Sequence, residues 1–299
     1  DASIEEVEPW RGTLLRQLYT ETSRALRRGL DKPVDKQAWI DKTRDIAAEL
    51  LEGRGFQPED LEELWRDRGE DYFLRERAED IAWHTEAVAG HRDREQALVL
   101  IRSDTDSTVG NTTQIFIHAR SRAQLFSRIC AEMEQLDLSI HDARIYNDQE
   151  GMSLDTFFVL SSDGSPISED GARLKHIAAH LTEALSGEPR DPEIIQRRTT
   201  RQQKSFSIPT ETSMSVDETK NVSVLEIATP DRPGLLARIG RIFVDFDLDL
   251  QAAKIQTLGE RVEDVFFITD EHQQPISDPE LVAAIQRAIC YELDEQAAA

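Results

Sequence analysis

The chain has 299 residues and carries 35 Lys and Arg against 58 Asp and Glu, which gives a formal net charge of −23. This acidic balance argues against nucleic acid and anionic membrane surfaces as partners, because both attract basic proteins. The length allows two or three domains with cores of their own, and no apolar run approaches the roughly 20 residues of a membrane span.

Cysteine usage and the first residue bear on the origin of the chain. The two cysteines, Cys130 and Cys290, fall on the apolar faces of predicted helices. We therefore expect two separate core residues, neither a disulfide nor a metal pair, in a reducing cytoplasm. The chain begins at Asp1 without Met, so we expect it to be a piece of a longer protein.

Residues 1–105 are predicted to form a helical segment, because their apolar residues recur at helical spacing. Gly53, Gly55 and Pro58 mark a break between two of its helices. No His there has a second His or a carboxylate at metal-ligand spacing, so we expect no metal site. The predicted helices cover residues 10–19, 40–51, 60–66 and 81–88.

Two polar stretches are predicted to be linkers. Residues 98–101 form a short apolar run that is a strand candidate, and residues 103–111 after it are polar and contain glycine. Residues 188–219 begin with a basic half, which either lies on the acidic domains or is a solvated linker. An alternation of apolar residues within 205–216 makes an added edge strand plausible there.

The remaining sequence contains an internal repeat with an offset of 110 residues. Ile117 aligns with Ile227, Leu125 with Leu235, and, after one residue is lost, Asp155 with Asp264. Each copy reads strand, helix, strand, strand, helix, with a fourth strand only weakly signalled. The pattern predicts two ferredoxin-like βαββαβ domains, at residues 111–187 and 220–297, and an α+β fold for the whole chain.

The loop from Asp231 to Leu235 is the candidate ligand site. Pro233 suits the first position of a helix, and Gly234 leaves the backbone open to a ligand. The free amides of a helix N-terminus favour a carboxylate, while Asp231 offers a partner for an ammonium group. A free amino acid carries both charges. In the alternative reading, Asp231 caps the helix and Pro-Gly merely shapes a turn.

These features together resemble a known family. The tandem repeat, with its Asp-Arg-Pro-Gly-Leu-Leu-Ala-Arg-Ile turn and an Asp-x-Phe-Phe in each copy, resembles paired ACT domains, which commonly bind amino acids. More narrowly, the helical segment is similar to that of the bifunctional PII uridylyltransferase/uridylyl-removing enzymes, which modify the nitrogen-signalling protein PII. Four phrases carry this similarity: Leu-Arg-Gln-Leu-Tyr at 15–19, Ala-Leu-Arg-Arg-Gly-Leu at 25–30, Asp-Tyr-Phe-Leu-Arg at 71–75 and Ile-Ala-Trp-His at 81–84.

The resemblance implies that this chain is the glutamine-sensing, allosteric part of such an enzyme in nitrogen metabolism. The family's nucleotidyltransferase and HD hydrolase domains, with their magnesium or other divalent metal, would lie upstream, so we expect no cofactor and no catalytic centre here. His141-Asp142 spells an HD dyad but lacks the further ligands of such a centre. The alternative is a free-standing ACT-type module that binds amino acids without an enzymatic role.

The resemblance also implies which residues hold the amino acid. The loop amides would bind its carboxylate, Asp231 or Asp249 its ammonium, and Gln251 an amide side chain. The first copy has Ser121, Ala123 and Gln124 where the second has Asp231, Pro233 and Gly234, so its loop is expected to be the poorer site. The candidate residues are Thr229, Asp231, Pro233, Gly234, Leu235, Asp249 and Gln251, with a weaker second site at Ser121, Gln124 and Ser139.

Overall fold

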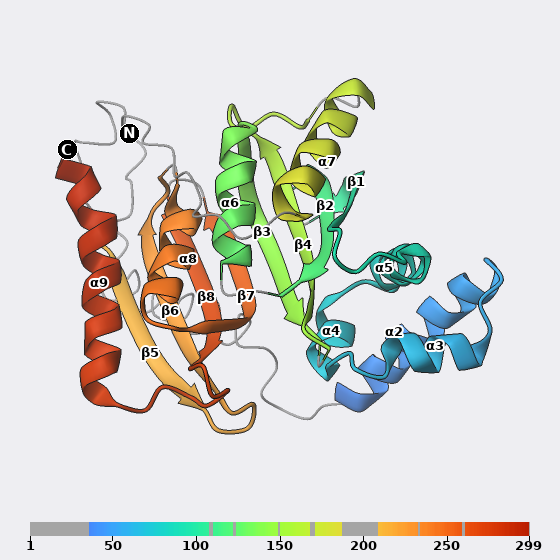
Figure 1. Cartoon of the computed structure of the whole chain (residues 1–299), viewed down its shortest axis with the longest axis horizontal. Coiled ribbons are helices and arrows are strands. Elements are labelled where there is room, and N and C mark those ends of the chain that lie inside the picture. Colours follow the sequence, from blue (N-terminus) through green and yellow to red (C-terminus); the bar gives the residue numbers. More distant parts are fainter. Residues whose placement is uncertain are drawn as a thin grey trace, which may run out of the picture.

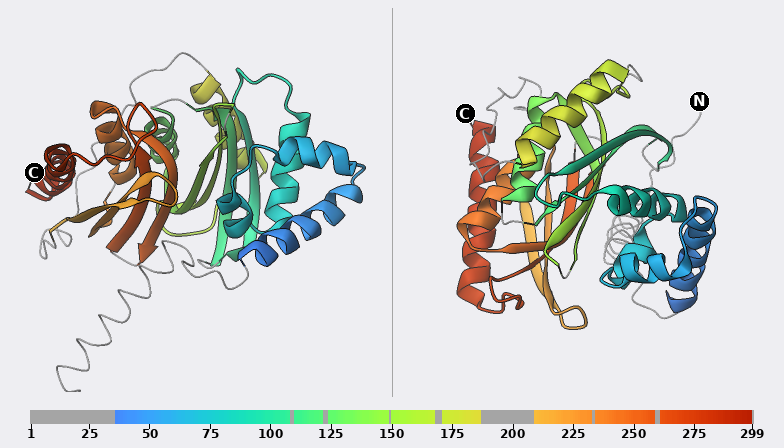
Figure 2. Two further views of the ribbon diagram at one scale, coloured as in Figure 1. Left: turned by 90° about the horizontal axis from the view of Figure 1, so that it is seen from below. Right: turned by 45° about the vertical axis from the view of Figure 1, so that its right-hand side comes forward.

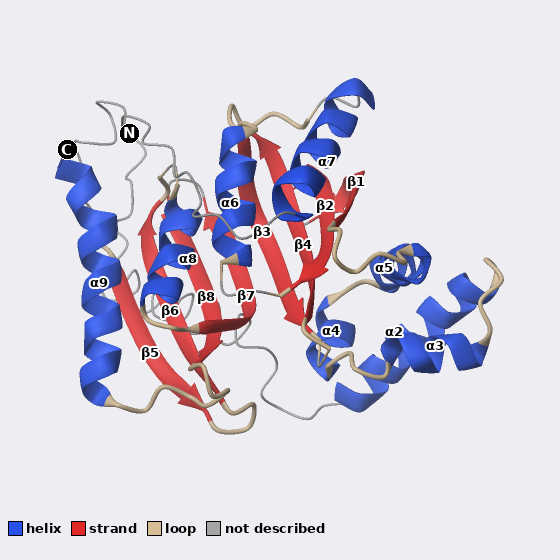
Figure 3. Ribbon diagram, in the orientation of Figure 1, coloured by secondary structure: helices blue, strands red, loops and turns tan. Residues whose placement is uncertain are grey.

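The computed structural model describes residues 36–298, apart from 108–109, 122–123, 149, 168–170, 187–208, 233 and 259–260. The predicted helix at 10–19 and the basic half of the predicted linker lie outside the described residues. What is described consists of a helical segment followed by one long β-sheet with helices against it (Figure 1; Figure 3).

The helical segment packs around its own hydrophobic core. It comprises α2 (Lys36–Glu52), α3 (Pro58–Trp65), α4 (Glu70–Arg75) and α5 (Ala78–Gly90), so the predicted helices at 40–51, 60–66 and 81–88 are confirmed. Pro58 occupies the first turn of α3, where its missing N–H costs nothing, and Asp60 accepts the Gln57 N–H at 3.0 Å. The short helix α4 was not predicted from the sequence. It is held by the burial of Tyr72 and Phe73, each of which contributes roughly 1.5–3 kcal/mol.

Two units with the same order of elements follow. The first contains β1 (Leu98–Ser107), β2 (Gly110–Arg120), α6 (Leu125–Gln135), β3 (Leu138–Asn147), β4 (Met152–Ser161) and α7 (Gly171–Ser186). The second contains β5 (Glu211–Asp217), β6 (Val222–Pro230), α8 (Leu235–Asp245), β7 (Asp249–Leu258), β8 (Arg261–Thr269) and α9 (Pro279–Ala298). The α+β fold class is confirmed.

The fourth strand of each unit comes first in the chain, not last. β1 pairs with β2, and β5 pairs with β6, so each fills the edge position that a ferredoxin-like unit gives to its last strand. The prediction of a linker at 103–111 and of a helical segment reaching 105 was therefore wrong. The cause is physical: an edge strand needs backbone partners but few apolar side chains, so polar composition does not distinguish it from a linker.

The eight strands of the described residues join in one antiparallel sheet of order β1-β2-β4-β3-β7-β8-β6-β5. The two units meet where β3 pairs with β7, at Asp142↔Gln256, Ala143↔Ile255 and Arg144↔Lys254; we call this pairing the seam. Helices α6, α7, α8 and α9 cover one face of the sheet (Figure 1). One hydrophobic core, which includes Ile129, Phe157, Ile239 and Phe266, runs through both units beneath those helices.

The helical segment covers the other face of the first unit (Figure 2). Phe116 of β2 points away from Ile115 and Ile117, because successive residues of a strand face opposite sides of the sheet. His84 of α5 stacks on Phe116, with their ring centroids 4.1 Å apart. The first unit is thus packed on both faces and serves as the platform for the helical segment.

Candidate ligand-binding cavity between the two units

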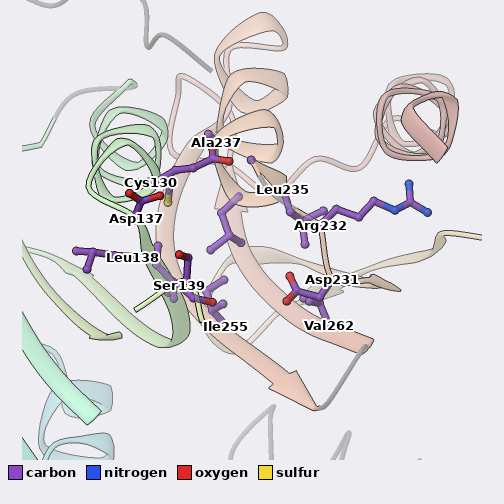
Figure 4. Close-up of a pocket in the computed structure, with 15 residues that line it drawn as sticks. Cys130, Asp137, Leu138, Ser139, Asp231, Arg232, Leu235, Ala237, Ile255 and Val262 are labelled. Atoms are coloured by element: carbon purple, nitrogen blue, oxygen red, sulfur yellow. The ribbon is translucent and has the colours of Figure 1, made fainter. Parts of the chain in front are cut away.

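A cavity of about 300 Å³ lies where the two units meet, on the side of the sheet that carries α6 and α8. The first unit contributes the end of α6 and the start of β3, and the second contributes the loop before α8 and the first turn of that helix. Figure 4 shows Asp137, Leu138 and Ser139 on one side and Asp231 on the other, with Leu235 between them. The volume falls at the lower end of the range for small-molecule pockets.

The N-terminus of α8 lines this cavity with Gly234, Leu235, Leu236 and Ala237. Gly234 is the N-cap residue with φ of 73°, in the left-handed region that glycine adopts more readily than residues with a Cβ, so the turn itself favours glycine here. The N-cap position belongs to Gly234, which has no side chain to cap the helix, and Asp231 lies three residues before it. The first amides of a helix have no partner within it, so this end attracts a negative group. Pro233 lies outside the described residues.

Asp231 stands at the mouth of the cavity. Asp231 is exposed on one side, but desolvation by the protein on the other side raises its pKa above 3.8. His141 and the Arg232 backbone N–H act in the opposite direction, toward a lower pKa. Burial lowers the pKa of His141, which Asp231 partly offsets, so these two side chains are electrostatic neighbours across the seam. Arg232 extends away from the cavity and donates to the carbonyl of Leu293 in α9 (Figure 4).

The opposite wall adds two more carboxylates and two hydroxyls. Glu134 and Asp137 come from the end of α6 and the turn after it, Ser139 comes from β3, and Ser162 directly follows β4. The cavity therefore presents a helix N-terminus for a carboxylate and three acidic side chains for an ammonium or amide group. Such an arrangement matches a zwitterion with an uncharged polar side chain.

The structure separates the residues that the sequence had grouped in one site. Asp231, Gly234 and Leu235 line the cavity, and so does Ser139, which had been placed with the first copy. Thr229 is buried and bonded to the hydroxyl of Thr210 at 2.9 Å. That bond turns the Thr229 hydroxyl toward the chain before β5, and Thr229 is not among the residues that line the cavity.

Asp249 and Gln251 lie away from the cavity. Asp249 accepts the Gln273 amide at 2.9 Å, and Gln251 donates to Thr269 at 2.9 Å. Asn147 at the end of β3 donates to Leu250 O at 2.7 Å, whereas Ser139 is at the start of β3. Because β3 and β7 are antiparallel, the beginning of β7 meets the end of β3 that lies away from the cavity. The cavity therefore combines the loop of the second unit with the strand of the first, and not the loop and strand of one repeat.

The loop of the first unit has a different local structure. Gln124, the N-cap of α6, has φ of −91°, and the Ser121 N–H is bonded to the carbonyl of Gly151 at 2.8 Å. Gln124 lines a hollow of only about 10 Å³ near α7. Ser121 and Gln124 are thus apart from Ser139, the third residue of the predicted weaker site. Ala123 lies outside the described residues.

Sequence reasoning missed the wall made by the first unit. Glu134, Asp137 and Cys130 fall on an ordinary amphipathic helix and its turn, with no local signal of a site. The strand pairing adds an indication that the sequence did not contain: His141 and Gln251 occupy equivalent positions, and each is the extra residue of a β-bulge. Bulges re-aim side chains and are common beside binding sites.

Two predicted absences concern the residues that the structure describes. His141-Asp142 lies in β3, and Asp142 faces Arg144 at 3.7 Å; within the described ranges no group of three or more His, Cys, Asp or Glu side chains has the geometry of a metal site. None of the described helices combines the length and apolar character needed to cross a membrane.

Two family models match parts of the chain. Residues 35–87 match the model described as "Uridylyltransferase GlnD fifth domain", and residues 223–290 match the ACT domain. The first match covers α2 to α5, and the second covers the unit whose loop lines the cavity. The predicted resemblance to ACT domains is confirmed for this second unit.

Nearly the whole chain is also similar to longer proteins. A bifunctional uridylyltransferase/uridylyl-removing enzyme from Ectopseudomonas mendocina is 50% identical over 289 residues, which are 97% of this chain and 32% of the relative. The enzyme of the same name from Azotobacter vinelandii is 51% identical over 284 residues, or 95% of this chain and 32% of the relative. A Pseudomonas putida relative is 50% identical over 284 residues. The chain thus spans about a third of the length of the curated relatives it matches.

Proposed function

The chain corresponds to the C-terminal part of bifunctional uridylyltransferase/uridylyl-removing enzymes, and from this premise we propose that it senses free glutamine on behalf of such an enzyme. Glutamine would bind in the cavity between the two units. Its occupancy would regulate the attachment of uridylyl groups to PII and their removal, by catalytic domains outside this chain. We propose that the first unit, which has the element order of the second, is an ACT domain as well.

The observation that carries this proposal is the composition of the cavity. The first turn of α8 supplies amides for the α-carboxylate, and Asp231 lies within reach of the same opening for the ammonium. Glu134 and Asp137 face them from the first unit. The side-chain amide of glutamine donates hydrogen bonds to such carboxylates, whereas the second carboxylate of glutamate would be repelled by them.

Calorimetry with glutamine and glutamate on the 299-residue chain tests the proposal. We expect saturable binding of glutamine and much weaker binding of glutamate. Asp231→Asn should weaken glutamine binding by about 1–3 kcal/mol, the usual range for a hydrogen bond to a charged group. Asp249→Asn is the matched control, because it makes the same change at an acidic residue outside the cavity, and it should leave the affinity unaltered.

Three results would contradict the proposal. One is equal affinity for glutamine and glutamate, and another is the absence of binding by either. The third is loss of affinity in Asp249→Asn with none in Asp231→Asn, which would move the site to the other end of the seam. Thermal midpoints of both variants, measured beside the affinities, separate lost binding from lost folding.

A further inference from the structure

The short helix α4 lies across the seam, on the face of the sheet opposite the cavity. Three of its charged residues reach the two units. Glu76, at its C-terminal end, pairs with Arg144 of β3 at 2.8 Å, and Arg75 donates to the carbonyl of Ala253 in β7 at 3.1 Å. Neighbouring residues of one helix thus hold opposite strands of the seam.

A third contact extends α4 further onto the second unit. Asp71 pairs with Lys220, just before β6, at 2.6 Å. Arg75 also lies over the ring of Tyr146 in β3, 5.5 Å from its centroid. Contacts to the second unit are therefore made by Asp71 and Arg75, one turn apart on the same face of the helix.

Other residues of the helical segment bind the first unit. The fully buried Asp80 of α5 pairs with Arg77 at 2.9 Å and with Arg102 of β1, whose guanidinium lies 4.0 Å from the ring centroid of Trp83. Tyr72 and His84 are bonded at 3.0 Å, which ties α4 to α5. The helical segment and the first unit therefore form one packed body, and α4 is the part of that body that contacts the second unit.

The cavity and α4 lie on opposite faces of the sheet, and both contact β7. Ile255 of β7 lines the cavity and pairs with Ala143 at the seam, while the carbonyl held by Arg75 is two residues earlier in β7. The described seam pairing covers three residues of each strand, and the units also meet in the shared core and where α6 crosses α8. A ligand bound by both units would add to these contacts and restrain the angle between the units.

We infer that α4 acts as a strap, by which we mean that it transmits occupancy of the cavity to the rest of the helical segment. The contacts of Arg75 and Asp71 with the second unit carry this coupling. This inference rests on the proposed function, because it takes glutamine as the occupant. A change in the angle between the units displaces Ala253 and Lys220 relative to α4, since the rest of α4 is packed with the first unit. The contacts of Arg75 and Asp71 are then stretched or relaxed, and this alters the stability of α4 within the helical segment. A ligand shifts such an equilibrium only by its differential affinity for the two arrangements.

Hydrogen exchange on the full 299-residue chain, with and without saturating glutamine, tests the strap. In the unaltered chain, glutamine should change the exchange rates of amides in α4 and α5 by about fivefold or more, the lower end of ordinary allosteric coupling. Arg75→Met keeps an apolar stem but removes the donor to Ala253, and Asp71→Asn removes the charge facing Lys220. The double variant should bind glutamine within about fivefold of the unaltered chain while its α4 and α5 amides no longer respond.

Arg54→Met is the matched control, because Arg54 belongs to the same helical segment but pairs with the exposed Glu86 and touches neither strand of the seam. It should respond like the unaltered chain. Calorimetry on each sample separates the two hypotheses. If the unaltered chain does not bind glutamine, both the proposed function and this inference are wrong. Binding without any change in α4 and α5, or an unaltered response in the double variant, overturns the strap alone.

Discussion

The two units share one order of elements and differ in what they contact. The first is packed on both faces and carries the helical segment through β1, β2 and β3. The second contributes the glycine-containing loop, in which Gly234 adopts a left-handed conformation where the first unit has Gln124 in a right-handed one. The two copies of the fold therefore have different roles, which we call the division of tasks: the first supports the helical segment, and the second supplies the helix N-terminus of the cavity.

The largest expected effect comes from the residues that face each other at the seam. Arg144 and Lys254 are equivalent in the repeat and are paired across the seam. Arg144→Met should destabilise the chain by about 3–5 kcal/mol, because it leaves the carboxylate of Glu76 buried without its partner. Glu76→Gln in the same chain should recover much of that loss. Denaturant unfolding of the single and double variants measures both.

Lys254→Met should behave in the opposite way. Burial, followed by the nearby Arg75 and Lys220, lowers the pKa of Lys254 to about 7. Since its ordinary pKa is 10.5, the unfolded chain binds more protons between these values, and stability rises with pH across that window. Replacing Lys254 should therefore cost little or stabilise the chain at pH 7. Equal destabilisation by Arg144→Met and Lys254→Met would contradict the division of tasks between the units.

A second expected difference concerns the buried Asp155. The first unit supplies the Ser153 hydroxyl to this carboxylate, whereas Val262 takes the place of Ser153 in the second unit. Burial nevertheless raises the pKa of Asp155 from 3.8 to about 7, with Ser153 and a backbone N–H acting against it. The folded chain then binds more protons between these values, so its stability falls as pH rises through that window.

Asp155→Asn should remove this loss. Asn has nearly the shape of protonated Asp and accepts the same hydrogen bonds, so the variant should match the unaltered chain near pH 4 and exceed it at pH 8. The difference should reach at most about 4 kcal/mol, because one pKa unit is worth about 1.4 kcal/mol. Unfolding free energies at the two pH values provide the measurement, and a parallel pH dependence of both proteins would refute the assignment.

The smallest expected effect lies where α6 and α8 cross. Gly240 of α8 is equivalent to Cys130 of α6, but Cys130 lines the cavity whereas a Cβ on Gly240 would lie 2.8 Å from the Cβ of Ser127. The Ser127 hydroxyl donates to Ala237 O at 2.8 Å, which holds the helices close. Gly240→Ala should cost about 1–2 kcal/mol, since crowding outweighs the gain in helix propensity.

Gly90→Ala is the control for that substitution. Gly90 is also helical, and a Cβ there would meet nothing within 4 Å. This change should stabilise the chain by up to about 1 kcal/mol through helix propensity alone. Thermal unfolding of the two variants gives the comparison, and a stabilising Gly240→Ala would show that the crossing has room to spare.

Many structural features of this protein could be predicted from residues that are close together in the sequence. Apolar spacing predicted α2, α3, α5 and the helices of the two units, because a helix that packs on a core must repeat its apolar residues about every 3.6 positions. The repeat predicted two copies of one fold, and the Asp231–Leu235 loop pointed to the helix N-terminus that lines the cavity. These features depend on residues close together in sequence, so the sequence carries them directly.

Tertiary structure decided which strands and loops meet. Local pattern indicated strands at 98–101 and within 205–216, but an edge position is open to a strand from either end of a unit, so it could not assign β1 and β5 to their places in the sheet. Antiparallel pairing of β3 with β7 carried Ser139 to the loop of Asp231 and removed Asp249 and Gln251 from it. Thr229 was turned toward Thr210 by the added strand. Each of these outcomes depends on contacts between residues far apart in the chain, whose energies no local period of the sequence records.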